Sequence, residues 1–172
     1  VVEDARRSGR PGVFGLRDRD FGPTNHARWS TMSECFFALE TFEIECFLLD
    51  AKALAACAIN TGGRQEEEIE ASLAKQASEL VWWMACRRVI AGLREARQQD
   101  FPAHPKRTSV PSREAARDVL LENDWVKRTA PGLAARVEAR ELLAALDAAH
   151  DDYAGHIASG TWKRVFSGKE IV

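Results

Sequence analysis

Two aspartates, Asp18 and Asp20, stand two residues apart at the end of a short apolar run near the start of this 172-residue chain. The run, Val13 to Leu16, follows a turn signal and predicts a short buried strand. Side chains at positions i and i+2 of a strand point to the same side, so the two carboxylates can converge. Paired carboxylates are hard oxygen ligands suited to Mg²⁺ or Mn²⁺. The alternative is a solvated strand end that leads into a turn, where aspartate is common.

The elements that must position these carboxylates are mostly helices. A second short strand is expected within residues 32–39, and the spacing of apolar residues predicts a helix from residue 44 onward. In that helix Ile44, Phe47, Leu48, Ala51 and Ala55 are expected on the buried face. Further helices are predicted over residues 66–98, 112–123 and 133–150, the second with Ser112 as its N-cap and the third with Ala158 as an alternative end.

Composition limits the classes of partner. Hydrophobic residues make up 45% and charged residues 29% of the chain, which is typical of a soluble globular protein. The net charge of −2 gives no general attraction to nucleic acid, so any such contact requires a local basic patch. No apolar run approaches the length of a membrane span, so we expect no membrane partner. The four cysteines show no CxxC spacing and are expected to be buried, reduced thiols of a cytoplasmic protein.

Three segments of the chain resemble one family. "VFGLRDRDF", residues 13–21, looks like the DxD strand of a TOPRIM (topoisomerase–primase) domain, and more narrowly of the TOPRIM-like domains attached to ABC-type ATPases, including the OLD-family nucleases. Those proteins continue with a segment of the type "l..reIEnyLLd..al", to which "LETFEIECFLLDAKAL", residues 39–54, is similar. A glycine–lysine pair near the domain end is also typical, and Gly168 and Lys169 supply it. The three matches occur in the family's order and span most of the chain.

The resemblance implies a fold, a set of site residues and an activity. The fold is α/β but predominantly helical, a single domain over residues 1–172 with a partial TOPRIM-like small parallel sheet and an extensive helical portion. Asp18, Asp20 and Glu45 would be catalytic metal ligands for Mg²⁺ or Mn²⁺, and Lys169 would contact phosphate or stabilise developing charge. The implied activity is metal-dependent cleavage of phosphodiester bonds in DNA or RNA, within a larger ATPase-associated nuclease. The implied partners are nucleic acid, with DNA preferred, and an ATPase domain or subunit.

The sequence departs from the family pattern in two places. The pattern begins with a glutamate on a strand well upstream of DxD, and Glu3 is too close to the Val13 strand to supply it. We therefore expect the domain to lack its first strand and to be a poor nuclease by itself. In addition, Cys46 stands where the family usually has asparagine.

A second hypothesis needs no catalysis. The chain would be a helical interaction or regulatory module on a larger ATPase, with a structural or degenerate acidic site. Glu45 would then be a polar residue at the edge of an apolar helical face. Lys169 would be an ordinary solvated lysine.

Overall fold

The computed structural model of the chain describes residues 4, 7–10, 12, 14–19, 21, 36–57, 62–95, 105–122 and 139–171. Most of these residues are helical, which confirms the prediction of a predominantly helical chain. The α-helices are α3 (Ala51–Ala56), α4 (Glu66–Glu79), α5 (Val81–Glu95), α6 (Arg113–Glu122) and α8 (Ala139–Ala158). The short 3₁₀ helices are η1 (Ile44–Leu48), η2 (Arg107–Ser109), η3 (Trp162–Arg164) and η4 (Gly168–Glu170).

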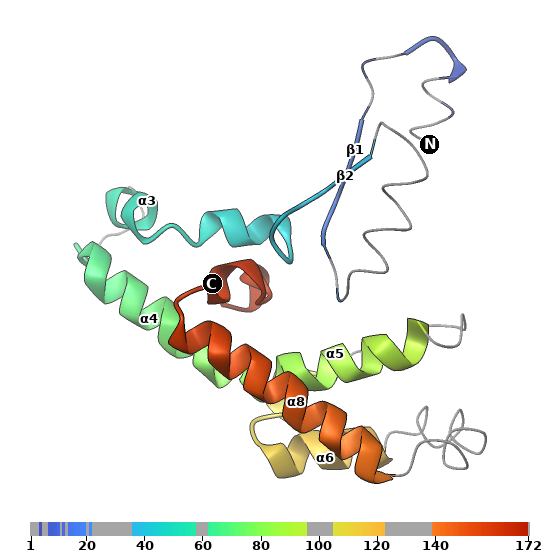
Figure 1. The fold of residues 1–172 in the computed structure, drawn as a ribbon. Coiled ribbons are helices and arrows are strands. Elements are labelled where there is room, and N and C mark those ends of the chain that lie inside the picture. Colours follow the sequence, from blue (N-terminus) through green and yellow to red (C-terminus); the bar gives the residue numbers. More distant parts are fainter. Residues whose placement is uncertain are drawn as a thin grey trace.

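Helix α5 forms the middle of the helical body, where it packs against α4, α6 and α8 (Figure 1). Among its residues 81–90 only Arg88 is exposed, as expected for a helix that is apolar on nearly all sides. The indole of Trp82 stacks on the imidazole of His150 in α8, with ring centroids 3.8 Å apart. Fully buried side chains around α5 include Leu80, Met84, Ile90, Leu120, Leu146 and Phe166. Within the described ranges, no helix is both long and apolar enough to cross a membrane.

The predicted single helix over residues 66–98 is wrong, because the chain leaves the helix at Leu80 and restarts at Val81. Leu80 has a ψ angle of −7°, and the chain changes direction there (Figure 1). The break has a packing reason. Helix α4 buries one stripe, formed by Ile69, Leu73 and Ala77, whereas α5 is buried on most sides. One straight helix could not present both surfaces to the same core.

The predicted buried face of the helix from residue 44 is wrong for its first three members, although Ala51 is buried as predicted. Ile44, Phe47 and Leu48 are exposed, whereas Cys46 and Leu49 are buried. Residues 44–48 form the 3₁₀ helix η1 rather than an α-helix. With three residues per turn, Cys46 and Leu49 lie on one face, and this face turns towards the core.

The N-cap prediction agrees with the structure better than the prediction of the buried face of η1. Ser112 Oγ accepts a hydrogen bond from the Ala115 N–H at 3.3 Å, which confirms Ser112 as the N-cap of α6. Asp50 Oδ1 accepts from the Ala53 N–H at 3.1 Å and caps α3 in the same way. Helix α8 runs to Ala158, and residues 133–138 of the helix predicted there lie outside the described residues.

Two three-residue strands, β1 (Gly15–Arg17) and β2 (Phe36–Ala38), pair in parallel with Leu16 opposite Phe37. The strand pair projects from the helical body, and Phe14, Leu16 and Phe37 are exposed (Figure 1). The expectation of a buried strand is therefore wrong for Phe14 and Leu16, and Val13 lies outside the described residues. Strands this short do not establish a TOPRIM-like sheet, which stays a prediction.

The cysteines only partly match expectation. Cys46 and Cys86 are buried, and burial raises the pKa of the Cys86 thiol to about 12. Cys57 is exposed, because it follows the last turn of α3 on the surface. Cys35 lies outside the described residues.

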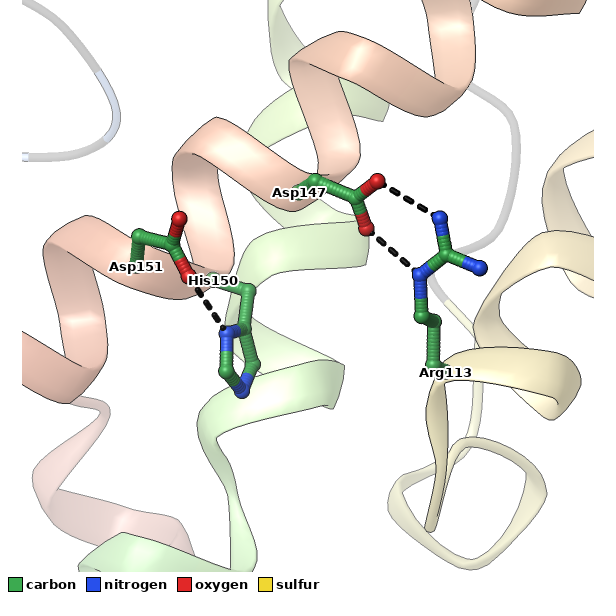
Figure 2. Close-up of polar contacts among 4 residues, drawn as sticks. All are labelled: Arg113, Asp147, His150 and Asp151. Carbon is green, nitrogen blue, oxygen red and sulfur yellow. Dashed lines mark hydrogen bonds and ion pairs between the residues drawn. The ribbon is translucent and has the colours of Figure 1, made fainter.

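A bidentate ion pair links helix α6 to helix α8 (Figure 2). Arg113 Nε and Nη2 donate to Asp147 Oδ1 and Oδ2 at 2.7 and 2.6 Å. On the same helix, His150 Nδ1 lies 3.1 Å from Asp151 Oδ1 (Figure 2). The hydrogen bonds from Arg113 hold the pKa of the Asp147 carboxyl below its ordinary value.

Removing this pair is expected to cause a small, pH-dependent loss of stability. Because the folded-state pKa of Asp147 is lowered, its contribution is present above the unfolded-state pKa and disappears as pH falls through the folded-state value. Both side chains are largely solvated, so Asp147→Asn should lower the melting temperature by no more than about 2 °C at pH 7. The difference from wild type should shrink as pH falls through the folded-state pKa of Asp147, and the exposed Glu141→Gln of the same helix serves as the control. Thermal melts between pH 7 and pH 2 measure it, and a difference that persists at the acid end would contradict this account.

Candidate functional site

The end of strand β1 is bonded to the start of η1. Asp18 Oδ1 accepts a hydrogen bond from the Ile44 N–H at 3.1 Å. The neighbouring Arg19 donates from Nη1 to the Glu40 carbonyl at 3.1 Å. The DxD segment and the segment at residues 39–54, which both carry the family resemblance, therefore lie in direct contact.

A buried carboxylate joins η1 to η4. The Glu43 side chain is only 6% exposed, and its Oε1 lies 3.0 Å from Lys169 Nζ. Its Oε2 accepts a hydrogen bond from Ser167 Oγ at 2.7 Å. The Lys169 side chain is 54% exposed, so its ammonium group is held at the surface by a carboxylate that lies beneath it. This contact brings the glycine–lysine pair to the second segment, across 124 positions of sequence between Glu43 and Ser167.

Gly168 lies directly on the backbone of η1. A β-carbon at this position would be 2.6 Å from both the Cys46 nitrogen and the Glu45 carbonyl carbon. Close by, the Cys46 thiol lies 3.2 Å from the Phe166 carbonyl oxygen, to which it donates a hydrogen bond. The glycine is thus required by close packing, and it sets Lys169 at a fixed distance from η1.

A second buried charge, Arg87 of α5, lies inside the core beneath this region. Its guanidinium carbon is 4.5 Å from the ring centroid of Trp83, 5.2 Å from that of Phe21 and 5.7 Å from that of Phe42. Aromatic faces attract a cation at these distances, which offsets part of the cost of its burial. Arg87 therefore ties Phe21, which directly follows the DxD segment, to the central helix.

Lys169 remains a cation in this environment. The hydrogen bond to Glu43 raises the pKa of its ammonium group above the ordinary value, partial burial and the charge of Arg87 oppose that rise, and Glu43 and Glu45 add to it through their charges. The charge on Lys169 is therefore present at neutral pH.

The structure describes only two of the three predicted metal ligands, Asp18 and Glu45. Asp18 contacts Ile44, the residue before Glu45, and Glu45 is half-buried on η1. Asp20 lies outside the described residues, as does Glu3. In the described part of the chain, no three His, Cys, Asp or Glu side chains form a group that could hold a metal ion. Asp18 accepts the hydrogen bond from Ile44 with one oxygen, and its carboxylate has about four lone-pair sites in all, of the hard oxygen type that Mg²⁺ and Mn²⁺ prefer.

Comparison of the chain with protein-family models, curated proteins and solved structures gave no match. The TOPRIM-like interpretation therefore rests on the three short segments and on the contacts between them.

The sequence reasoning missed Glu43 and Ser167, and it took Arg87 only as half of a basic pair with Arg88 on a solvated face or a DNA path, which the burial of Arg87 contradicts. Glu43 lies two positions before the glutamate that the resemblance selects, and no spacing pattern links it to Ser167. Arg87 did carry a signal, because it interrupts an apolar stretch of a helix, where a charge is seldom buried without compensating contacts.

Proposed function

We propose that this chain contributes a TOPRIM-like, metal-dependent site that cleaves phosphodiester bonds in DNA or RNA, in the cytoplasm and alongside an ATPase domain or subunit. The observation that supports it most is the meeting of the three family-like segments. Asp18 binds the backbone of η1, and Glu43 at the start of η1 binds Lys169. These contacts bring together the segments that the resemblance assigns to one site.

Each residue has a chemical role in this proposal. Asp18 and Glu45, together with Asp20, would hold Mg²⁺ or Mn²⁺. The cation would activate the attacking oxygen and stabilise the leaving oxygen. Lys169 presents an exposed ammonium group, which suits a non-bridging phosphate oxygen. Arg87 is too deeply buried to touch a substrate, so its role is to support the site from below.

Binding of Mn²⁺ tests the proposal. We expect calorimetry to detect binding to the wild type that is weakened at least about tenfold in Asp18→Asn, because the variant loses a charged ligand. Asparagine can still accept the hydrogen bond from Ile44, so the fold should be kept. The exposed Glu141→Gln is the control for loss of one negative charge. Equal Mn²⁺ binding by the wild type and Asp18→Asn would refute the metal site.

Cleavage of supercoiled plasmid by this chain alone should be slow, because Glu3 does not supply the upstream glutamate.

The second hypothesis, a non-catalytic interaction module, is favoured by one observation. Large apolar side chains are exposed on both the strand pair and η1, namely Phe14, Leu16, Phe37, Ile44, Phe47 and Leu48. Exposed apolar surface of this kind often marks a site where another protein binds. A wild-type chain that neither binds Mn²⁺ nor cleaves plasmid would favour this hypothesis.

A further inference from the structure

We propose that Glu43 is a positioning residue that holds the Lys169 ammonium group in place for a phosphate of the nucleic-acid backbone. This inference rests on the proposed function of the same site. Glu43 itself would touch neither metal nor substrate, and it would act only through Lys169.

The burial of Glu43 is the first argument. A carboxylate taken out of water must recover its lost hydration from specific partners. Glu43 has one partner on each oxygen, Lys169 on Oε1 and Ser167 on Oε2, and both partners come from the same short segment. The carboxylate is thus placed to fix that segment, and the lysine in particular, against η1.

The exposure of Lys169 is the second argument. An ammonium group has three donors, and one of them directed at Glu43 leaves two for another acceptor. A free lysine side chain loses rotamer freedom when it is immobilised on a ligand. Lys169 loses that freedom on folding, because Glu43 holds its head and Gly168 fixes its backbone. The contact with phosphate is therefore prepared in advance.

Positioning and simple electrostatics predict opposite effects on binding. Glu43 is a negative charge close to Lys169, so its removal should strengthen binding of any polyanion if charge alone matters. If Glu43 positions Lys169, its removal should weaken binding, because the lysine becomes mobile. The sign of the change therefore separates the two roles.

The experiment measures binding of a fluorescein-labelled 20-nucleotide single-stranded DNA by anisotropy, at low salt and with a chelator present. Lys169→Met should weaken binding several-fold, and Glu43→Gln by about two- to fivefold despite its lost negative charge. The double variant should bind no more weakly than Lys169→Met. The matched control is Glu40→Gln, an exposed glutamate three positions away whose interaction with Arg19 uses only its backbone carbonyl. It should bind as well as the wild type or better.

Ser167→Ala keeps every charge and removes the second partner of Glu43, so it gives the same test if Glu43→Gln does not fold. It should weaken DNA binding in the direction of Glu43→Gln. Tighter binding by Glu43→Gln, matching Glu40→Gln, would overturn the positioning role, as would unchanged binding by Ser167→Ala. If Lys169→Met weakens binding while the Glu43 and Ser167 variants do not, only this inference fails. If Lys169→Met binds DNA like the wild type, the phosphate role of Lys169 in the proposed function fails with it.

Discussion

Replacing Leu49 with alanine is expected to lower the free energy of unfolding by about 2–5 kcal/mol, whereas the same change at Leu48 should alter it by less than about 0.5 kcal/mol. The two leucines are neighbours in the chain, but Leu49 is 1% exposed and Leu48 is 63% exposed. Truncation of Leu49 removes buried contacts and leaves a cavity in the core, while truncation of Leu48 removes atoms that already contact water.

Urea unfolding monitored by circular dichroism measures both changes, and the slope of unfolding free energy against urea shows whether the denatured state is altered. Leu48→Ala is the matched control, because it deletes the same atoms. The two results decide the orientation of η1. A larger loss at Leu48 than at Leu49 would mean that Ile44, Phe47 and Leu48 face the core, as the helical pattern of the sequence predicts.

Replacing Gly168 with alanine is expected to lower the free energy of unfolding by about 1–3 kcal/mol or more. The added β-carbon would meet backbone atoms of Glu45 and Cys46 at 2.6 Å, and backbone cannot yield as the end of a flexible side chain can. The repulsion would push η4 off η1 and strain the ion pair between Lys169 and Glu43. Glu43 should then no longer hold the Lys169 side chain in place, even in molecules that remain folded.

The control for this change is Gly155→Ala, an exposed position in the last turn of α8. A β-carbon there would meet nothing within 4 Å, so the variant should be more stable by about 0.5–1 kcal/mol, the usual difference between alanine and glycine inside a helix. Thermal or urea unfolding of both variants gives the comparison. Gly168→Ala as stable as the wild type would show that η1 and η4 are not packed so closely.

Helices with local signals could be predicted from the sequence, and contacts between distant segments could not. Helix α6 was predictable because Ser112 and the apolar spacing that follows it are both local features. The buried face of η1 was not, because spacings of three and of 3.6 residues both fit its apolar residues. The choice between them is made by η4, which lies far away in sequence and covers Cys46 through Gly168.

The same difference between local signals and contacts of distant segments applies to the candidate site. Asp18 was selected by its place after a strand and Lys169 by the resemblance of its glycine–lysine pair to the family, and the role of both residues in a site stays a prediction. The contact between Lys169 and Glu43 could not be predicted. The segment "FEIE" contains two glutamates, Glu43 and Glu45, and its sequence does not show which of them is buried. Burial depends on the tertiary contact with Ser167, which no pattern within residues 39–54 contains.

The separation of Glu43 from Ser167 has a consequence for how the site arises during protein synthesis. A ribosome adds about 5–20 residues per second, so the 124 positions between them take roughly 6–25 s to translate. Throughout that interval the chain already contains Asp18 and Glu43 but does not yet contain Lys169. η1 is also covered only after Glu43 contacts Ser167. Closing so long a loop is among the slower steps of folding. In a chain still attached to the ribosome, Glu43 therefore lacks both of these side-chain partners until residues 167–169 have been added.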